Sequence, residues 1–154
     1  MTIYFNIRYS VFVILGFGFM FFSCNDNTAS NSTATTNTAT TAADNTAYPE
    51  GKKIYQKTCI VCHQSTGEGM MGTYPPLANS DYLLANKYRG MHQVLKGSSA
   101  SITVNGNTYN GVMPPQSLTD EEVAQVLNYV YHSWGNNGFT LSAADVKSVR
   151  DSLK

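Results

Sequence analysis

Hydrophobic and polar positions divide this chain into four parts. Residues 11–22 are apolar without interruption, whereas residues 25–47 contain only Asn, Thr, Ala, Ser and Asp. Apolar positions at helical spacing begin near residue 48, and a polar break after residue 135 separates a short last part. We therefore predict four segments, which cover residues 1–23, 24–47, 48–135 and 136–154.

The pattern predicts mainly helices in the third segment. Three short helices are expected over residues 50–59, from Ser80 toward Tyr88, and over residues 90–96. The clearest helix begins at Thr119, where Glu122 completes a capping box, and Gly135 marks its end. Its apolar stripe consists of Val123, Val126, Leu127, Val130 and Trp134.

Two further features complete the expected architecture. Asn105-Gly106 lies inside an insert at residues 102–109 and is a type I′ turn signal, which predicts a β-hairpin. Ser142 and Asp145 signal another helix start, and the apolar positions Val146, Val149 and Leu153 follow. This last helix has two open interpretations, packing on the domain or binding a partner. The predicted fold class is all-α with a short β-hairpin-like insert.

Composition excludes several classes of protein. The 154 residues carry ten basic and ten acidic side chains, and this balance argues against nucleic-acid binding, which requires a basic field. Three cysteines are too few for a scaffold stapled by several disulfides. Six cations form either a docking face for an acidic partner or a set of separate solvated side chains. They are Lys52, Lys53, Lys57, Lys87, Arg89 and Lys96.

The amino-terminal segment has the features of an export signal. Twelve apolar residues in a helix span about 18 Å, well short of the roughly 30 Å hydrocarbon core of a bilayer. A signal peptide fits this length, and a tilted amino-terminal anchor is the alternative. Phe21-Phe22-Ser23-Cys24 resembles a bacterial lipoprotein signal, with Phe21 where leucine is usual. The resemblance implies that Cys24 is lipidated and begins the mature chain.

Residues 25–47 lack large apolar side chains that could offset the entropy of ordering, so we expect a flexible tether. Asn31-Ser32-Thr33 fits a glycosylation sequon, but a bacterial-type signal disfavours that alternative. We expect the protein to lie in the bacterial cell envelope, where it is a membrane-anchored lipoprotein that faces the periplasm.

Cys59-Ile60-Val61-Cys62-His63 is the attachment sequence of c-type haem. Two thiols at this spacing reach both vinyl groups of one porphyrin, and the adjacent His63 supplies an axial nitrogen ligand. A thioredoxin-type redox pair would require a βαβ pattern that is not visible, and a zinc site would need a further ligand pair. The predicted cofactor is one covalently bound haem c.

A low-spin haem iron needs a sixth ligand. The candidates are Met70, Met71, Met91, Met113, His92 and His132. The first two lie within eight residues of His63, too near to reach the opposite haem face. Met91 is expected to pack in the core, and His132 points away from its helix stripe toward solvent. Met113 precedes two prolines that fix its loop. We predict Met113 as the ligand, with a buried core methionine as the alternative.

These residues resemble the class I monohaem cytochrome c family over residues 48–134. The resemblance implies covalent attachment at Cys59 and Cys62 and iron ligation by His63 and Met113. It also implies that a small–aromatic pair on the first helix crosses the last helix; these positions are Gly51, Tyr55, Val126 and Tyr129. The insert at residues 102–109 is similar to that of bacterial members associated with respiratory and nitrite-reducing chains.

The leading functional hypothesis is a membrane-tethered, non-enzymatic one-electron carrier in an envelope respiratory chain. Its expected partners are a quinol-oxidising donor, a terminal oxidase or reductase acceptor, and the membrane through the lipid anchor. Two alternatives remain open at this point. The protein is either a haem subunit of a dehydrogenase or reductase complex, or a haem catalyst or gas sensor with an open axial position.

Overall fold

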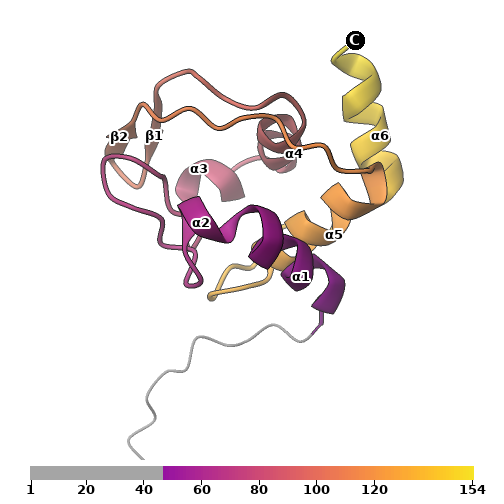
Figure 1. The fold of residues 1–154 in the computed structure, drawn as a ribbon, viewed down its shortest axis with the longest axis horizontal. Coiled ribbons are helices and arrows are strands. Elements are labelled where there is room, and N and C mark those ends of the chain that lie inside the picture. Colours follow the sequence, from indigo (N-terminus) through magenta and orange to yellow (C-terminus); the bar gives the residue numbers. More distant parts are fainter. Residues whose placement is uncertain (1–46) are drawn as a thin grey trace, which may run out of the picture. The chain divides into compact units, whose positions relative to one another are not determined.

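The computed structural model describes residues 47–154. The predictions for residues 1–23, for Cys24 and for the tether up to residue 46 lie outside them. Six helices and two strands are found in the described part (Figure 1). They are α1 (Pro49–Thr58), α2 (Ile60–His63), α3 (Asp81–Leu84), α4 (Lys87–Lys96), β1 (Ile102–Val104), β2 (Asn107–Tyr109), α5 (Asp120–Tyr131) and α6 (Ala143–Ser152). The predicted all-α class with a short hairpin is confirmed. None of these helices combines the length and apolar content needed to cross a bilayer.

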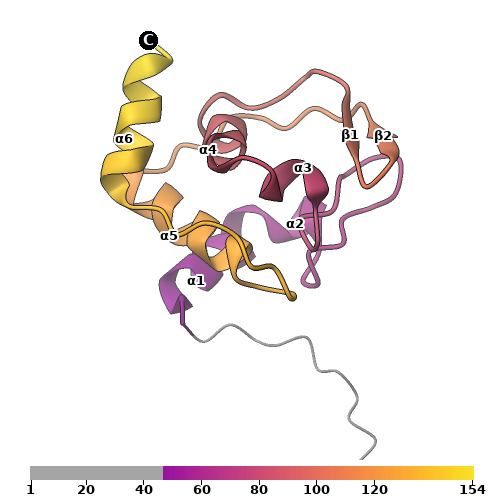
Figure 2. The ribbon, with the colours of Figure 1, turned by 180° about the vertical axis from the view of Figure 1, so that it is seen from behind.

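The crossing of α1 and α5 organises the fold. The two helices lie side by side in both views (Figures 1 and 2). Gly51 permits this approach, because a Cβ atom there would overlap the carbonyl of Gln125 and lie 2.9 Å from Cβ of Tyr129. Tyr55, 1% exposed, packs with its ring centre 5.4 Å from that of Tyr129. The predicted small–aromatic pair therefore makes the expected contact.

Two predicted helix boundaries are wrong. Ser80 caps α3 by accepting a hydrogen bond from the Leu83 N–H, but the helix ends at Leu84 and does not reach Tyr88. Instead, Asn86 starts α4 by accepting from the Tyr88 N–H over 2.9 Å. An Asn side chain caps a helix as effectively as Ser, so the helix predicted over residues 90–96 begins earlier, at Lys87.

The end of α5 is the second correction. The predicted capping box between Thr119 and Glu122 is present. The helix ends at Tyr131, however, and Trp134 lies beyond it with φ of +55°. Nδ2 of Asn136 donates to the Val130 carbonyl over 2.8 Å and so satisfies a group at the helix end. Trp134 is consequently not part of the helical stripe.

The hairpin forms as predicted. Strands β1 and β2 are antiparallel, with Ile102 opposite Tyr109 and Val104 opposite Asn107. Asn105 and Gly106 have φ of +49° and +78°, as a type I′ turn requires. Figures 1 and 2 show the hairpin and α6 at opposite ends of the described domain.

Helix α6 packs on the rest of the domain, as the first of its two open interpretations expects. Val146 and Val149 are buried and belong to the same core cluster as the apolar residues of α5. Arg150 Nε lies 2.6 Å from a carboxylate oxygen of Asp120. Asn128 holds the connection in place, because its side chain donates to the Leu141 carbonyl and accepts from the Leu141 N–H over 2.9 and 2.7 Å.

Candidate haem site

The junction of α1 and α2 brings both thiols to one pocket. Cys59 ends α1 with its N–H bonded to the Tyr55 carbonyl over 2.8 Å, and α2 begins at the next residue. Cys59 and Cys62 are partly buried, line the same pocket and do not form a disulfide. Burial raises the pKa of the Cys59 thiol to about 11, and the neighbouring Cys62 adds to the effect. The thiol is therefore protonated at neutral pH.

His63 is held in the form that binds a metal through Nε2. The side chain is 9% exposed, and Nδ1 lies 3.0 Å from the carbonyl oxygen of Pro75. Because a carbonyl only accepts, Nδ1 carries the proton. Burial lowers the pKa of His63, although the hydrogen bond to Pro75 opposes this effect. A neutral imidazole that donates from Nδ1 keeps the lone pair of Nε2 for a metal ion.

The loop after His63 is fixed by contacts that the sequence analysis missed. Gly69 N–H donates to the His63 carbonyl over 3.1 Å, and Trp134 Nε1 donates to the Ser65 carbonyl over 3.0 Å. Gly67 packs against the Trp134 ring so closely that a Cβ atom would lie 2.5 Å from it. The two glycines at a spacing of two were the available signal. Trp134 thus holds the histidine loop rather than extending α5.

Met113 lines the same pocket from a separate, rigid loop. Its N–H and carbonyl each bond to Ser98 over 2.8 Å. Gly97, with φ of +76°, allows this approach, because a Cβ atom there would lie 2.5 Å from the Met113 carbonyl oxygen. In the sequence, Gly97 directly follows the helix predicted over residues 90–96, and a glycine there signals only the end of a helix. The structure brings Met113 and His63, 50 residues apart, to one cavity.

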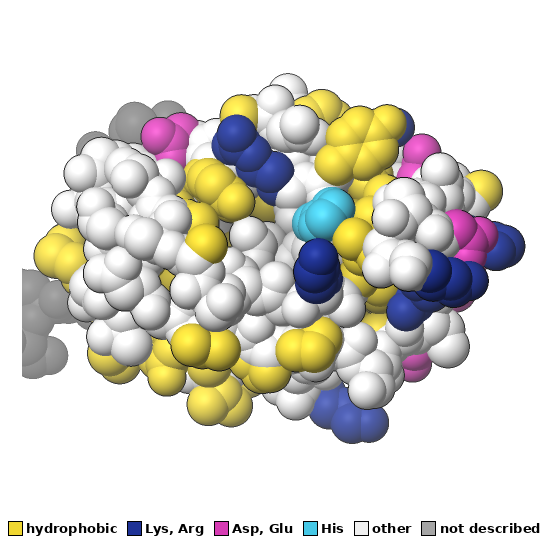
Figure 3. Space-filling model, turned by 90° about the horizontal axis from the view of Figure 1, so that it is seen from above, with side chains coloured by type: hydrophobic (Ala, Val, Ile, Leu, Met, Phe, Trp, Pro, Cys, Tyr) yellow, Lys and Arg dark blue, Asp and Glu magenta, His cyan; other side chains and the backbone are white. Residues whose placement is uncertain are grey.

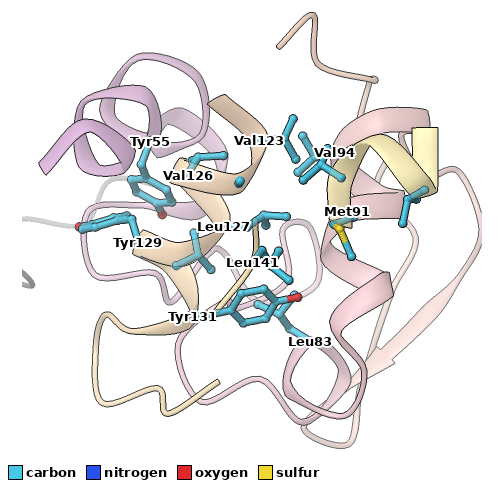
Figure 4. Packing of buried hydrophobic residues seen from close by; sticks show 14 residues of the cluster. Tyr55, Leu83, Met91, Val94, Val123, Val126, Leu127, Tyr129, Tyr131 and Leu141 are labelled. Atoms are coloured by element: carbon cyan, nitrogen blue, oxygen red, sulfur yellow. The ribbon is translucent and has the colours of Figure 1, made fainter. Parts of the chain in front are cut away.

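None of the other candidate ligands lines this pocket. Met70 and Met71 are 50% and 82% exposed, while Met91 is fully buried in the core, as predicted (Figure 4). His132 differs from its prediction as a solvated residue: it is partly buried, with its ring centre 5.2 Å from that of Tyr48 and Nε2 3.1 Å from Thr140 Oγ1. His92 is exposed on α4.

The pocket suits a covalently bound haem. It has a cavity volume of about 210 Å³, and no Asp, Glu, Lys or Arg side chain lines it. Its walls are largely apolar, its two thiols suit covalent attachment to a porphyrin, and its neutral imidazole and thioether are the types of iron ligand found in cytochromes c. Within residues 47–154, no three His, Cys, Asp or Glu side chains gather at a site that could hold a metal ion. The zinc alternative therefore has no support in this part of the chain.

Three of the six cations make contacts of their own. Lys53 pairs with Glu50 over 2.7 Å, and Lys87 pairs with Asp145 over 3.2 Å. The Arg89 guanidinium lies 4.4 Å from the ring centre of Tyr82. On the face seen in Figure 3, basic side chains are interspersed with polar, apolar and acidic ones. These contacts favour the interpretation of separate cations.

Comparison with known proteins identifies a family for this chain. The family model described as Cytochrome c matches residues 48–134. Cytochrome c-552 of Thermus thermophilus is 39% identical over 114 residues, which cover 68% of this chain and 76% of that protein.

Two further relatives are subunits of larger assemblies. The cytochrome c subunit of alcohol dehydrogenase (quinone) from Gluconacetobacter polyoxogenes is 30% identical and covers 71% of this chain. The fructose dehydrogenase cytochrome subunit of Gluconobacter japonicus is 32% identical and covers 68%. This chain spans about a quarter of either subunit, 24% and 23%. With a family match over more than half of its length, the chain belongs to the cytochrome c family of electron-transfer proteins with covalently bound haem c.

Proposed function

We propose that this protein is a membrane-tethered, monohaem electron carrier of a bacterial envelope respiratory chain, with His63 and Met113 as the axial ligands of its iron. The main support for this ligand assignment is that His63 and Met113 line one pocket and are each fixed by their own hydrogen bonds. The Pro75 carbonyl orients the imidazole, and two hydrogen bonds to Ser98 hold the backbone of the methionine.

Each residue has a distinct part in this proposal. Cys59 and Cys62 bind the porphyrin covalently, so the cofactor does not dissociate. Neutral His63 and the thioether of Met113 would both hold the iron and would leave no position for an external ligand. The apolar walls exclude water and keep the surroundings fixed when the charge of the site changes. When bound, the haem supplies a reversible Fe(III)/Fe(II) couple, and methionine–histidine ligation favours a raised potential.

Optical spectra test the axial ligands. The haem-loaded protein is recorded oxidised, reduced, and reduced in the presence of carbon monoxide. We expect a low-spin spectrum that carbon monoxide does not change, and a carbon monoxide response in Met113→Ala. Met71→Ala is the matched control, because Met71 is exposed and does not line the pocket. A wild-type protein that binds carbon monoxide readily contradicts the ligand assignment and favours a catalyst or gas sensor.

Attachment to the membrane rests on Cys24, which lies outside the described residues. The apolar run at residues 11–22 and the lipoprotein-like Ser23-Cys24 pair support it. We expect the full-length protein to sediment with membranes and to incorporate labelled palmitate, and Cys24→Ala to lose the label. Loss of the label without any change in haem content would separate anchoring from cofactor binding. Membrane association that survives without label would instead favour an uncleaved helical anchor.

A fixed subunit of a dehydrogenase or reductase complex is the second candidate. It is favoured by the similarity to cytochrome subunits of alcohol and fructose dehydrogenases. Mild-detergent purification from the native source distinguishes the two. A stoichiometric flavin- or quinone-dependent partner supports the subunit, whereas a protein that elutes alone and exchanges electrons with several acceptors supports the free carrier.

A further inference from the structure

One buried polar atom in the haem pocket has no hydrogen-bond partner. Within residues 47–154, the only such side-chain atom is Oε1 of Gln93. Gln93 lies on α4 and lines the pocket, and its Nε2 donates to the Tyr82 hydroxyl over 3.2 Å. Leaving a buried polar group without a partner is unfavourable, because the group has lost its hydrogen bonds to water. A group that enters the pocket is therefore the expected partner of this amide.

Tyr82 is fixed from two directions. The Arg89 guanidinium lies 4.4 Å from its ring centre, and Arg89 Nη1 donates to the Tyr82 backbone carbonyl over 2.8 Å. Tyr82 also lines the pocket, next to Gln93. The Tyr82 hydroxyl thus positions the Gln93 amide, and Arg89 positions Tyr82.

A bound haem c would bring carboxylates to this pocket, and a carboxylate needs hydrogen-bond donors. Haem c carries two carboxylates, and no Lys or Arg side chain lines the pocket to neutralise them. A buried carboxylate without donors is strongly unfavourable. Any carboxylate that becomes buried there must therefore accept hydrogen bonds from uncharged side chains of the pocket.

Gln93 satisfies this need when its amide is turned over. The two ends of a carboxamide have the same shape, so hydrogen bonding decides which end faces which partner. In the turned orientation, the Tyr82 hydroxyl donates to Oε1, and the two N–H groups of Nε2 occupy the place of the unpaired oxygen. All polar atoms of the pair are then satisfied once an acceptor arrives.

We infer that Gln93, positioned by Tyr82 and Arg89, donates a hydrogen bond to a carboxylate of the bound haem and thereby raises the reduction potential of the iron. A negative charge near the iron favours the ferric state, and a hydrogen-bond donor disperses that charge. This inference rests on the proposed haem site. Tyr82 is a positioning residue in it, because its effect passes through the amide.

The test is the midpoint potential of the haem-loaded protein, measured with Gln93→Leu, Gln93→Met and Tyr82→Phe. Each Gln93 variant is expected to lower the equilibrium constant for reduction threefold to tenfold, and tenfold corresponds to about 59 mV for one electron. Tyr82→Phe is expected to have a smaller effect of the same sign. The double variant Tyr82→Phe/Gln93→Leu is expected to match Gln93→Leu, because the phenol acts through the amide.

Infrared difference spectra of haem with isotope-labelled carboxylates give a second readout. The carboxylate bands are expected to shift in the Gln93 variants. The matched controls are Tyr88→Phe and Gln56→Leu, both exposed and outside the pocket. Both Leu and Met are tested at position 93, so that poor packing of one side chain is not mistaken for loss of the hydrogen bond.

Two outcomes overturn the inference. One is an equilibrium constant for reduction within twofold of wild type in all Gln93 variants. The other is an unchanged set of carboxylate bands together with loss of the methionine-ligated spectrum, which would place the amide on the Met113 sulfur. A wild-type protein that binds carbon monoxide would contradict the proposed axial ligands, and the carboxylate bands would still report on Gln93 separately.

Discussion

Single residues at the haem pocket are placed by close backbone contacts rather than by their own chemistry. Met113 faces the pocket because Gly97 lets the end of α4 approach its carbonyl, and because Ser98 bonds to its backbone on both sides. Pro114 and Pro115 limit the remaining freedom of the loop. The position of the proposed ligand therefore depends on a glycine that does not itself line the pocket.

Gly97→Ala is expected to lower the free energy of unfolding by about 3 kcal/mol and to weaken ligation by Met113. At φ of +76° and ψ of −175° the backbone is essentially restricted to glycine and costs an alanine about 1–3 kcal/mol, and the overlap with the Met113 carbonyl adds to this. Denaturant unfolding and the affinity of the ferric protein for added imidazole measure the two effects. Gly72→Ala is the control, because Gly72 has the same φ of +76° with nothing within 4 Å. Equal losses in both variants would mean that the close approach contributes nothing.

Asp145 is expected to make stability pH-dependent at the start of α6. The hydroxyl and N–H of Ser142, with the Lys87 ammonium, hold the pKa of this carboxyl at about 2, below its usual 3.8. The stabilisation is complete above the unfolded-state pKa and is lost as the pH falls from about 4 toward 2. Urea unfolding of wild type and Asp145→Asn should differ at pH 6 and converge near pH 2. A constant difference across this range would contradict the assignment.

At the scale of elements, the sequence predicted the start of a helix better than its end. The capping boxes at Thr119 and Ser142 and the turn at Asn105-Gly106 are local signals, and all three are present. The end of α5 was mispredicted, because Asn136, from beyond the helix, satisfies a carbonyl at that end. The break before α4 had a local signal in Asn86, which was overlooked.

Gly51→Ala at the crossing of α1 and α5 tests whether packing or helix propensity decides the change in stability, because the two effects predict changes of opposite sign. Propensity alone makes Gly51→Ala stabilising by about 0.5–1 kcal/mol. Packing makes it destabilising, because the new methyl overlaps the Gln125 carbonyl and crowds Tyr129, and overpacking costs about 1–3 kcal/mol. We expect a lower midpoint of thermal unfolding. Gln56→Ala, on an exposed position of α1, should change it little, and a more stable Gly51→Ala protein would rule out the tight crossing.

At the scale of the whole domain, the segment after the family match is part of the folded unit. Helix α6 lies outside residues 48–134 but supplies Val146 and Val149 to the core. Asn128 and the pair Arg150–Asp120 join it to α5. We therefore expect α6 to unfold together with the haem domain.

Asn128→Ala is expected to destabilise the domain by about 2–4 kcal/mol, because it leaves the N–H and the carbonyl of Leu141 buried without partners. Circular dichroism of the helices and haem absorbance should follow one unfolding transition at a lower denaturant concentration. Ser148→Ala, on the exposed side of α6, is the control. Two separate transitions in the wild-type protein would show that α6 folds independently.

The sequence by itself determined the chemistry of this protein. Cys59, Cys62 and His63 lie within five consecutive residues, so their spacing alone specifies covalent haem attachment. Caps and turn residues likewise act over three or four positions. Contacts between distant residues were decided by tertiary structure. Met113 was selected from its Pro-Pro loop, but the fold decides that it meets His63 in one pocket. The fold also decides the contact of Trp134 with the histidine loop and the buried amide of Gln93 beside Tyr82. Such contacts depend on how the helices pack, and no local pattern in the sequence encodes that geometry.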